Sequence, residues 1–251
     1  MIRAVVLLAA LAAVAAAQPG PASVTLTYGG QSMFVMTTST GLKALIDPVA
    51  PMMYKNAPVD GVDVVTITHE HPDHNYAQLA TGNPTVIHGL AGGDVAAIDQ
   101  TVKGVRIRTV GTFHDSQQGG QRGKNAVFVF ELPGLKVVHL GDLGHALDAQ
   151  QIAAIGPVDV LLIPVSGGPT IDPKTAVEVI GQLSPKVVIP MHYGTGAPAG
   201  GGGGRGFSLG GVDAFLKVLD PTTKVVPEGH TLTLTAGKLP AGRTVMVMKN
   251  E

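Results

Sequence analysis

One short segment constrains the fold and chemistry of this chain more than any other. Residues 69–74 read His-Glu-His-Pro-Asp-His, so three imidazoles and a carboxylate that can bind a metal occur within six positions. They directly follow residues 64–68, an apolar run that is typical of a buried strand. The segment therefore predicts a cluster of metal-ligating side chains where a buried strand ends.

The spacing within this cluster predicts two metal ions. Alternate side chains of an extended chain point to the same side, so His69 and His71 can approach one ion together. Asp73 and His74 lie where the chain turns into a short helical segment that we expect over residues 75–80. They are therefore directed differently and can serve a second ion.

The N-terminal residues 1–17 match a secretory signal peptide. A basic start at Arg3 precedes an apolar run over 4–14 and the small residues Ala15 and Ala17. That run has about 11 residues, whereas a helix that spans a bilayer needs roughly 20. We expect the segment to be removed and the protein to be exported, periplasmic or secreted, without stable membrane insertion; an uncleaved anchor is the alternative.

Composition favours a small-molecule substrate over nucleic acid. The chain has 17 basic and 18 acidic residues, and loss of Arg3 with the signal would leave a net charge of −2. Such a balance does not supply the basic face that a phosphate backbone requires. The absence of cysteine excludes thiolate ligands and disulfides. Residues 18–251 are numerous and apolar enough for one domain with a full core, while the oligomeric state is not indicated.

Hydrophobic periodicity predicts an α/β fold of two mixed sheets covered by helices. Antiparallel runs early in the chain give way to alternating strands and helices. The clearest helix begins at Pro173, with Asp172 as its N-cap. Strands are expected over 23–28, 33–37, 43–47, 64–68, 85–88, 105–110, 126–131, 136–140, 158–164, 186–190, 231–235 and 244–248, and helices over 148–155, 173–183 and 212–219.

Three later segments add potential ligands. His114, Asp142 and His192 each follow a predicted strand, in the segments Phe-His-Asp, Gly-Asp-Leu-Gly-His and Pro-Met-His-Tyr-Gly. A rigid strand can hold the side chain at its end within the tolerance that a metal demands. Seven candidate ligands are then available.

Together these motifs resemble the metallo-β-lactamase superfamily, in which a His-x-His-x-Asp-His cluster is followed by a later His, a Gly-Asp and a last His. The resemblance spans roughly residues 24–193 and is strongest to metal-dependent hydrolases resembling ascorbate-6-phosphate lactonase-like proteins, judging from Leu-Ile-Asp-Pro at 45–48 and Val-Ile-Pro-Met-His-Tyr at 188–193. It implies an αββα sandwich with a two-metal site at its edge. It also implies the ligands His69, His71 and His114 for one metal, Asp73, His74 and His192 for the other, and Asp142 bridging them.

The activity that the resemblance implies is hydrolysis of a small ester, lactone or phosphodiester by a metal-bridged hydroxide. Two ions would lower the pKa of a shared water from about 15.7 towards neutrality. Asp73 would be the catalytic residue, since it can bind one ion, orient the hydroxide and accept its proton. Imidazole and carboxylate ligands suit Zn²⁺, two per chain, while Mn²⁺ and Fe²⁺ stay open.

Two other functions are weighed against this hydrolase: a β-lactamase, and a metal-binding protein without catalysis. The lactam-hydrolysing branches of the superfamily lack a bridging aspartate at the fourth motif and some carry cysteine there, whereas this chain has Asp142 and no cysteine. A β-lactamase is therefore the weaker expectation. RNA-processing members carry extra substrate-binding domains or basic arms, which this sequence does not show.

Several residues near the predicted ligands receive structural interpretations. Asp47 resembles the superfamily's buried aspartate behind the metals and is expected to support them. His139 and Tyr193 are expected to pack in the core, although the Tyr193 hydroxyl is also a candidate oxyanion donor. His88 and His230 are interpreted as structural.

Other neighbours stay undecided between two roles. His145 either contacts the site or is structural, and Asp115 either orients His114 or caps a turn. Glu70 is expected to point away from the metals. The glycine-rich segments 119–124 and 199–206 are interpreted as flexible loops, with three cations as alternative contacts for an anionic substrate group: Arg122, Lys124 and Arg205.

Overall fold

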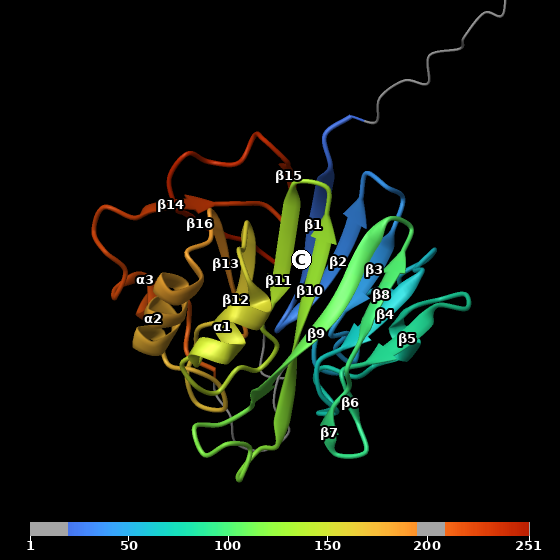
Figure 1. Ribbon diagram of the computed structural model, residues 1–251, viewed down its shortest axis with the longest axis horizontal. Helices are drawn as coiled ribbons and strands as arrows, with labels where there is room; N and C mark the ends of the chain where they lie inside the picture. Colours follow the sequence, from blue (N-terminus) through green and yellow to red (C-terminus); the bar gives the residue numbers. More distant parts are fainter. Residues whose placement is uncertain (1–19, 195–208, 251) are drawn as a thin grey trace, which may run out of the picture.

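The computed structural model describes residues 20–194 and 209–250. The predicted signal peptide and the glycine-rich segment 199–206 lie outside the described residues, and so does Arg205. Within the described part of the chain, two β-sheets pack face to face, and helices lie against one of them (Figure 1).

The first sheet has six strands in the order β15-β1-β2-β3-β4-β5. Its antiparallel half comes from the two ends of the described chain, and the strands β3, β4 and β5 are parallel to one another. The strands are β1 (Ser23–Gly30), β2 (Met33–Thr38), β3 (Lys43–Ile46), β4 (Val64–Ile67), β5 (Thr85–His88) and β15 (Thr231–Thr235).

The second sheet has eight strands in the order β14-β16-β13-β12-β11-β10-β9-β8. Strands β11, β12 and β13 are parallel, and β9 runs the same way because both β9 and β11 are antiparallel to β10. The carboxyl ends of β9, β11 and β13 therefore meet at one edge. The strands are β8 (Asp99–Val102), β9 (Val105–Phe113), β10 (Lys124–Leu132), β11 (Leu135–His139), β12 (Val160–Pro164), β13 (Val187–Met191), β14 (Lys224–Pro227) and β16 (Thr244–Val247).

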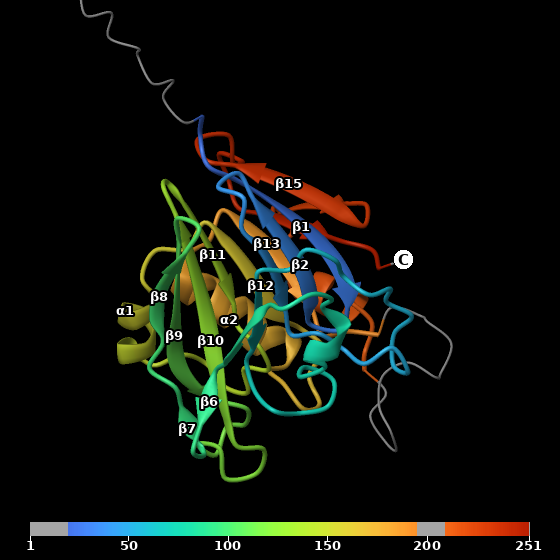
Figure 2. The same ribbon diagram turned by 90° about the vertical axis from the view of Figure 1, so that its right-hand side faces the viewer.

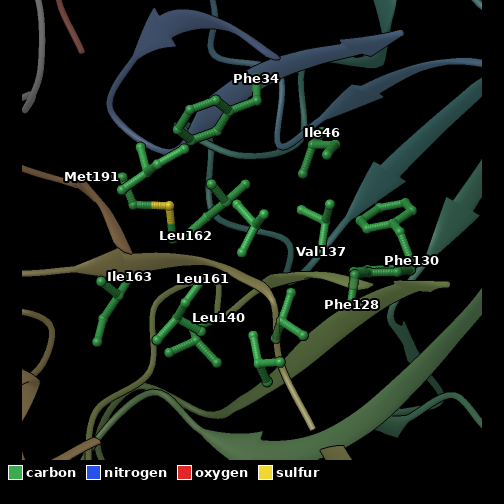
Figure 3. Packing of buried hydrophobic residues seen from close by; sticks show 14 of the residues in the cluster. Phe34, Ile46, Phe128, Phe130, Val137, Leu140, Leu161, Leu162, Ile163 and Met191 are labelled. Carbon is green, nitrogen blue, oxygen red and sulfur yellow. The ribbon is translucent and has the colours of Figure 1, made fainter. Parts of the chain in front are cut away.

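The main core fills the space between the sheets. Alternation along the strands directs every second side chain inwards, so Ala44 and Ile46 join the main core while Leu45 joins a smaller cluster on the outer face of the first sheet. Figure 3 shows Phe34 and Ile46 of the first sheet facing Leu162 and other apolar side chains of the second.

Helices α1 (Ala149–Ile155) and α2 (Pro173–Leu183) lie on the outer side of the second sheet, away from the first (Figures 1 and 2). The predicted N-cap of α2 is confirmed, because the Asp172 carboxylate accepts from Thr175 N at 2.7 Å. On the outer face of the first sheet, the described residues supply loops and a single 3₁₀ turn, η1 (Ala77–Leu79), whose Leu79 is buried there. The mixed α/β sandwich is thus confirmed, with its helical cover concentrated on one side.

Some predicted elements need correction. The helix expected over 212–219 is a single turn, α3 (Asp213–Leu216). Strands β8 and β14 and the hairpin of β6 (Leu90–Ala91) and β7 (Asp94–Val95) escaped prediction because they are short and mostly exposed, without the alternation of a half-buried strand. In the described residues, we find no helix with the length and apolar character needed to cross a bilayer.

Candidate metal centre

The structure brings all seven predicted ligands together at one edge of the sandwich. The loop after β4 supplies four of them, and the segments after β9, β11 and β13 supply one each. Their ligand atoms form three overlapping groups. Within each group, the ligand atoms lie within 4.8 Å of one another. These groups are His69, His71 and His114; His69, His74 and Asp142; and Asp73, His74 and His192.

Asp142 lies at the centre of this arrangement. Its Oδ2 atom is 3.2 Å from Nε2 of each of His74, His114 and His192. It is also 3.8 Å from Nε2 of His69. Its other oxygen, Oδ1, is buried without a hydrogen-bond partner among the described residues. One carboxylate is therefore shared by imidazoles from both outer groups.

The predicted approach of His69 and His71 is confirmed, although the backbone is not a strand there. Strand β4 ends at Ile67, and both histidines lie in the turn that follows. His69 Nε2 and His71 Nδ1 are 2.9 Å apart, and the rings meet edge to face with centroids 4.5 Å apart. The turn continues through a backbone bond from His74 N to His71 O at 3.0 Å.

Asp47 supports the histidine cluster from behind, as predicted. It is fully buried and accepts from Thr68 N at 2.8 Å and Thr68 Oγ1 at 2.6 Å. Its Oδ2 lies 2.8 Å from His74 Nδ1. When Nδ1 donates to this carboxylate, Nε2 of His74 carries its lone pair towards Asp142 and the site.

Two amides that sequence reasoning missed also hold the site. Asn125 is buried; its Oδ1 accepts from Asp142 N at 3.0 Å, and its Nδ2 donates to Leu140 O at 2.9 Å. Gln31, in the turn between β1 and β2, donates from Nε2 to Asp73 Oδ2 at 2.9 Å. The only local signal for Gln31 was its place between the strands expected over 23–28 and 33–37.

The electrostatics of the site favour a cation. The pKa of His69 lies well below its usual value, mainly because the side chain is buried and secondly because His74 is close. Its imidazole is therefore neutral. Burial opposes charge on His74, but the attraction of Asp142 and Asp73 outweighs it and raises the pKa of His74 well above the usual value. Burial likewise would raise the pKa of Asp142, yet His192 and His74 lower it well below the usual range. A cation bound here would compete with the proton on His74, so binding releases protons.

The donor set fits a metal on structural grounds. Five imidazoles and two carboxylates converge in a mostly buried site. Asp142 Oδ1 is buried without a hydrogen-bond partner, which is energetically unfavourable unless a cation binds it. Imidazole nitrogen and carboxylate oxygen are ligands that zinc accepts, and the supporting bonds from Asp47 match the outer contacts that orient ligating histidines.

The nearby histidines and Tyr193 are structural. His139 is fully buried; its Nδ1 accepts from Gly141 N at 3.1 Å, and its Nε2 lies 2.8 Å from Ser32 O. This agrees with the core role predicted for it. In His145, Nε2 accepts from Phe113 N at 3.1 Å and Nδ1 lies 2.7 Å from Ala146 O, so both ring nitrogens are occupied. The Tyr193 hydroxyl donates to Met248 O at 3.0 Å, which supports the packing role rather than the oxyanion one.

The remaining neighbours stabilise the loops. Asp115 caps a turn, since its carboxylate accepts four backbone N–H groups between residues 117 and 122 at 2.7–3.0 Å. Glu70 points away from the site and lies 2.7 Å from His88 Nδ1 at the surface. Lys124 pairs with Asp94 at 2.7 Å. His230 belongs to none of the metal-ligating groups.

Comparison with known proteins agrees with this geometry. A family model described as the β-lactamase superfamily domain matches residues 25–192, about two thirds of the chain, so the chain belongs to this superfamily. More particularly, it is 32% identical over 238 residues to a UPF0173 metal-dependent hydrolase of Polaromonas sp., covering 75% of this chain and 85% of that one. A UPF0173 metal-dependent hydrolase of Carboxydothermus hydrogenoformans is 28% identical over 233 residues, covering 80% of this chain and 99% of that one.

A solved structure gives the same result. The crystal structure of a candidate Zn-dependent hydrolase of the metallo-β-lactamase superfamily from Thermotoga maritima is similar with a TM-score of 0.70 and 38% identity. The match covers 91% of this chain and all of that one. The protein is accordingly a metal-dependent hydrolase with the metallo-β-lactamase fold.

Proposed function

We propose that the seven ligands hold two divalent cations, zinc in the first place, and that the enzyme hydrolyses a small ester, lactone or phosphodiester. The observation that carries this proposal is the position of Asp142 Oδ2, at 3.2 Å from His114 of one group and from His74 and His192 of the other. A carboxylate so placed can serve as a ligand common to two ions. The absence of cysteine and the presence of Asp142 favour this reading over a β-lactamase.

The residues of the site would have distinct roles in this hydrolysis. Divalent cations held by these ligands would supply an activated water and would polarise the oxygen of the scissile group. Asp73 is the carboxylate among the ligands that reaches solvent, with 27% of its side chain exposed, against 2% for Asp142. Because Gln31 occupies its Oδ2, we assign Oδ1 of Asp73 as the atom that orients the attacking water and accepts its proton.

The test combines metal content with a substrate panel. Apo-protein is loaded with Zn²⁺, Mn²⁺ or Fe²⁺, the metal-to-protein ratio is measured by mass spectrometry, and turnover is compared on bis-p-nitrophenyl phosphate, p-nitrophenyl esters, simple lactones and nitrocefin. We expect two ions per chain and fastest turnover on an ester, lactone or phosphodiester. Nitrocefin as the fastest substrate would make the protein a β-lactamase, and a single ion would contradict the dinuclear site.

We also propose that the enzyme is exported, with residues 1–17 as its signal peptide. This rests on the basic start, the apolar run and the small residues before Gln18. Expression of the full chain in a bacterium with a Sec pathway, followed by fractionation and N-terminal sequencing, tests it. The expected mature N-terminus is Gln18 in the periplasm or medium, whereas an intact Met1 in the cytoplasm would contradict export.

A further inference from the structure

The turn between β1 and β2 carries a residue that no ligand motif includes. Gln31 is only 3% exposed and has a φ of 54°, in the left-handed region. That conformation costs a non-glycine residue of this kind on the order of 1 kcal/mol. Glycine or asparagine would suit the position at lower cost. The use of glutamine there points to a task for its side chain.

Strained backbone is concentrated around the metal centre. Six described residues other than glycine have positive φ, and three of them, Gln31, Asp47 and His192, belong to this site. Such conformations persist where surrounding contacts over-determine them. For Gln31, the backbone oxygen accepts from the Tyr28 hydroxyl at 3.0 Å and from His192 N at 2.7 Å.

Gln31 therefore contacts two members of one ligand group. Its backbone oxygen receives the His192 amide, while its side-chain Nε2 donates to Asp73 Oδ2 at 2.9 Å. The third member of that group, His74, is held separately by Asp47 at 2.8 Å. Each ligand of the group thus has an anchoring contact, and two of the three anchors come from one residue.

Asp73 is the ligand that most needs such an anchor. Of the seven, only His71 and Asp73 are not fully buried, and 27% of the Asp73 side chain is exposed. Packing alone does not fix a side chain so open to solvent, whereas an amide from a buried residue can restrict its rotamers.

Building on the dinuclear function, we propose that Gln31 is a positioning residue: its amide fixes the Asp73 carboxylate and thereby sets the affinity of the ion held by Asp73, His74 and His192. The ion held by His69, His71 and His114 does not depend on it, because the described residues show no hydrogen bond from Gln31 to any of these three. Gln31 thus acts on one of the two ions.

The test removes the donor and keeps the backbone. Gln31→Met preserves side-chain length and the carbonyl that receives His192. It loses the N–H that reaches Asp73 and also the Oε1 that accepts from the Tyr54 hydroxyl at 3.5 Å, which lies outside the ligand set. We expect the affinity for the second Zn²⁺ to fall about 10–100-fold, with the first unchanged. Competition of apo-protein with a chromophoric chelator measures both affinities without any substrate.

Two further variants make the result specific. Gln31→Asn suits the left-handed backbone better and keeps an amide, but is one methylene too short to reach Asp73. It should therefore lower the affinity for the second ion as much as Gln31→Met does, without loss of stability. Gln118→Met is the matched control, because Gln118 also has positive φ (55°) but is exposed. It should bind both ions as the wild type does.

A double-mutant cycle identifies the route. In an Asp73→Ala background, Gln31→Met should change the affinity of the remaining ions by no more than about twofold. Wild-type affinity for both ions in Gln31→Met and Gln31→Asn would overturn the positioning role alone. An undiminished effect without Asp73 would do the same. If the wild-type protein itself bound no second ion, the dinuclear function would fail and this inference with it.

Discussion

At the scale of single residues, the site depends on a carboxylate enclosed by imidazoles. Asp142 comes from the loop after β11, and its ligand oxygen contacts histidines delivered by three other segments. Its backbone is fixed in turn by Asn125, which accepts from Asp142 N. Replacement of the Asp142 side chain would therefore disturb three histidines at once.

Asp142→Ala should therefore remove metal and activity together. Without the shared oxygen, we expect one ion or fewer per chain and a fall in kcat/KM of at least about 100-fold, because both ions would lose a ligand. Metal analysis after dialysis and kinetics on the best substrate check this. Retention of two ions and full rate would show that Asp142 does not bridge.

His139→Ala should act on stability instead. The ring is buried and holds Ser32 and Gly141 through its two nitrogens. Its loss leaves a cavity and unpaired backbone groups, at a cost of about 2–4 kcal/mol in the free energy of unfolding. Urea denaturation measures this cost. The folded fraction should still take up two ions, and a loss of metal without loss of stability would mean that His139 is a ligand.

The sequence identifies the seven candidate ligands and Asp47 behind them, but not the two amides, Gln31 and Asn125, that also hold the site. Several histidines and aspartates at the ends of strands form a recognisable pattern, because such a group of residues is typical of a metal site and has few other functions. Gln31 and Asn125 carry ordinary amides, and their partners lie 42 and 17 residues away in the chain, so only the folded structure reveals their contacts. Asp115 and His145 stayed undecided for the same reason.

At the scale of elements, close approach of two loops completes the site. Gly144, after β11, lies against the backbone of the loop after β9: a Cβ added there would be 2.2 Å from Asp115 N and 2.3 Å from the carbonyl carbon of His114. The two loops are also joined by a bond from Gly144 N to Phe113 O at 2.9 Å. His114 and Asp142 can meet because no side chain separates their loops.

Gly144→Ala should push these loops apart. Since the clash is with backbone, we expect a loss of about 1–3 kcal/mol of stability together with weaker zinc binding. Gly181→Ala is the matched control, because Gly181 is in helix α2 and a Cβ added there would meet nothing within 4 Å. It should gain roughly 0.5–1 kcal/mol and bind zinc normally. Thermal unfolding measures the stability of both variants, and chelator competition measures their zinc affinity. Equal stability and equal zinc affinity in the two variants would contradict the close approach of the loops.

The elements themselves were predictable where burial imposed a pattern. Strands such as β4, β12 and β13 are buried at every position and appear in the sequence as apolar runs. Strands β8 and β14 are mostly exposed and carry no such signal. Helix α3 is shorter than its apolar spacing indicated, and only its Phe215 is buried.

At the scale of the whole molecule, the candidate metal centre lies where segments of both sheets meet. Residues 69–74 leave the first sheet after β4, while His114, Asp142 and His192 leave the second. The core holds the sheets together through apolar packing, as Figure 3 shows. Ions bound between segments of both sheets would add a second link at the edge.

Removal of metal should consequently lower the melting temperature. Binding at about 100 times the dissociation constant stabilises a fold by about 2.7 kcal/mol, which corresponds to roughly 5–10 °C for a chain of this size. Calorimetry of zinc-loaded protein before and after chelation measures the shift, and added zinc should restore it. The shift should shrink in Asp142→Ala, whereas an equal shift there would place the stabilising ions elsewhere.

The most direct test of the dinuclear centre is anomalous diffraction from a crystal of the zinc-loaded protein, with data collected on both sides of the zinc absorption edge. We expect two anomalous peaks, one surrounded by His69, His71 and His114 and the other by Asp73, His74 and His192, with the Asp142 carboxylate between them. A single peak, or two peaks of which one lies away from these residues, would contradict a dinuclear centre at this site.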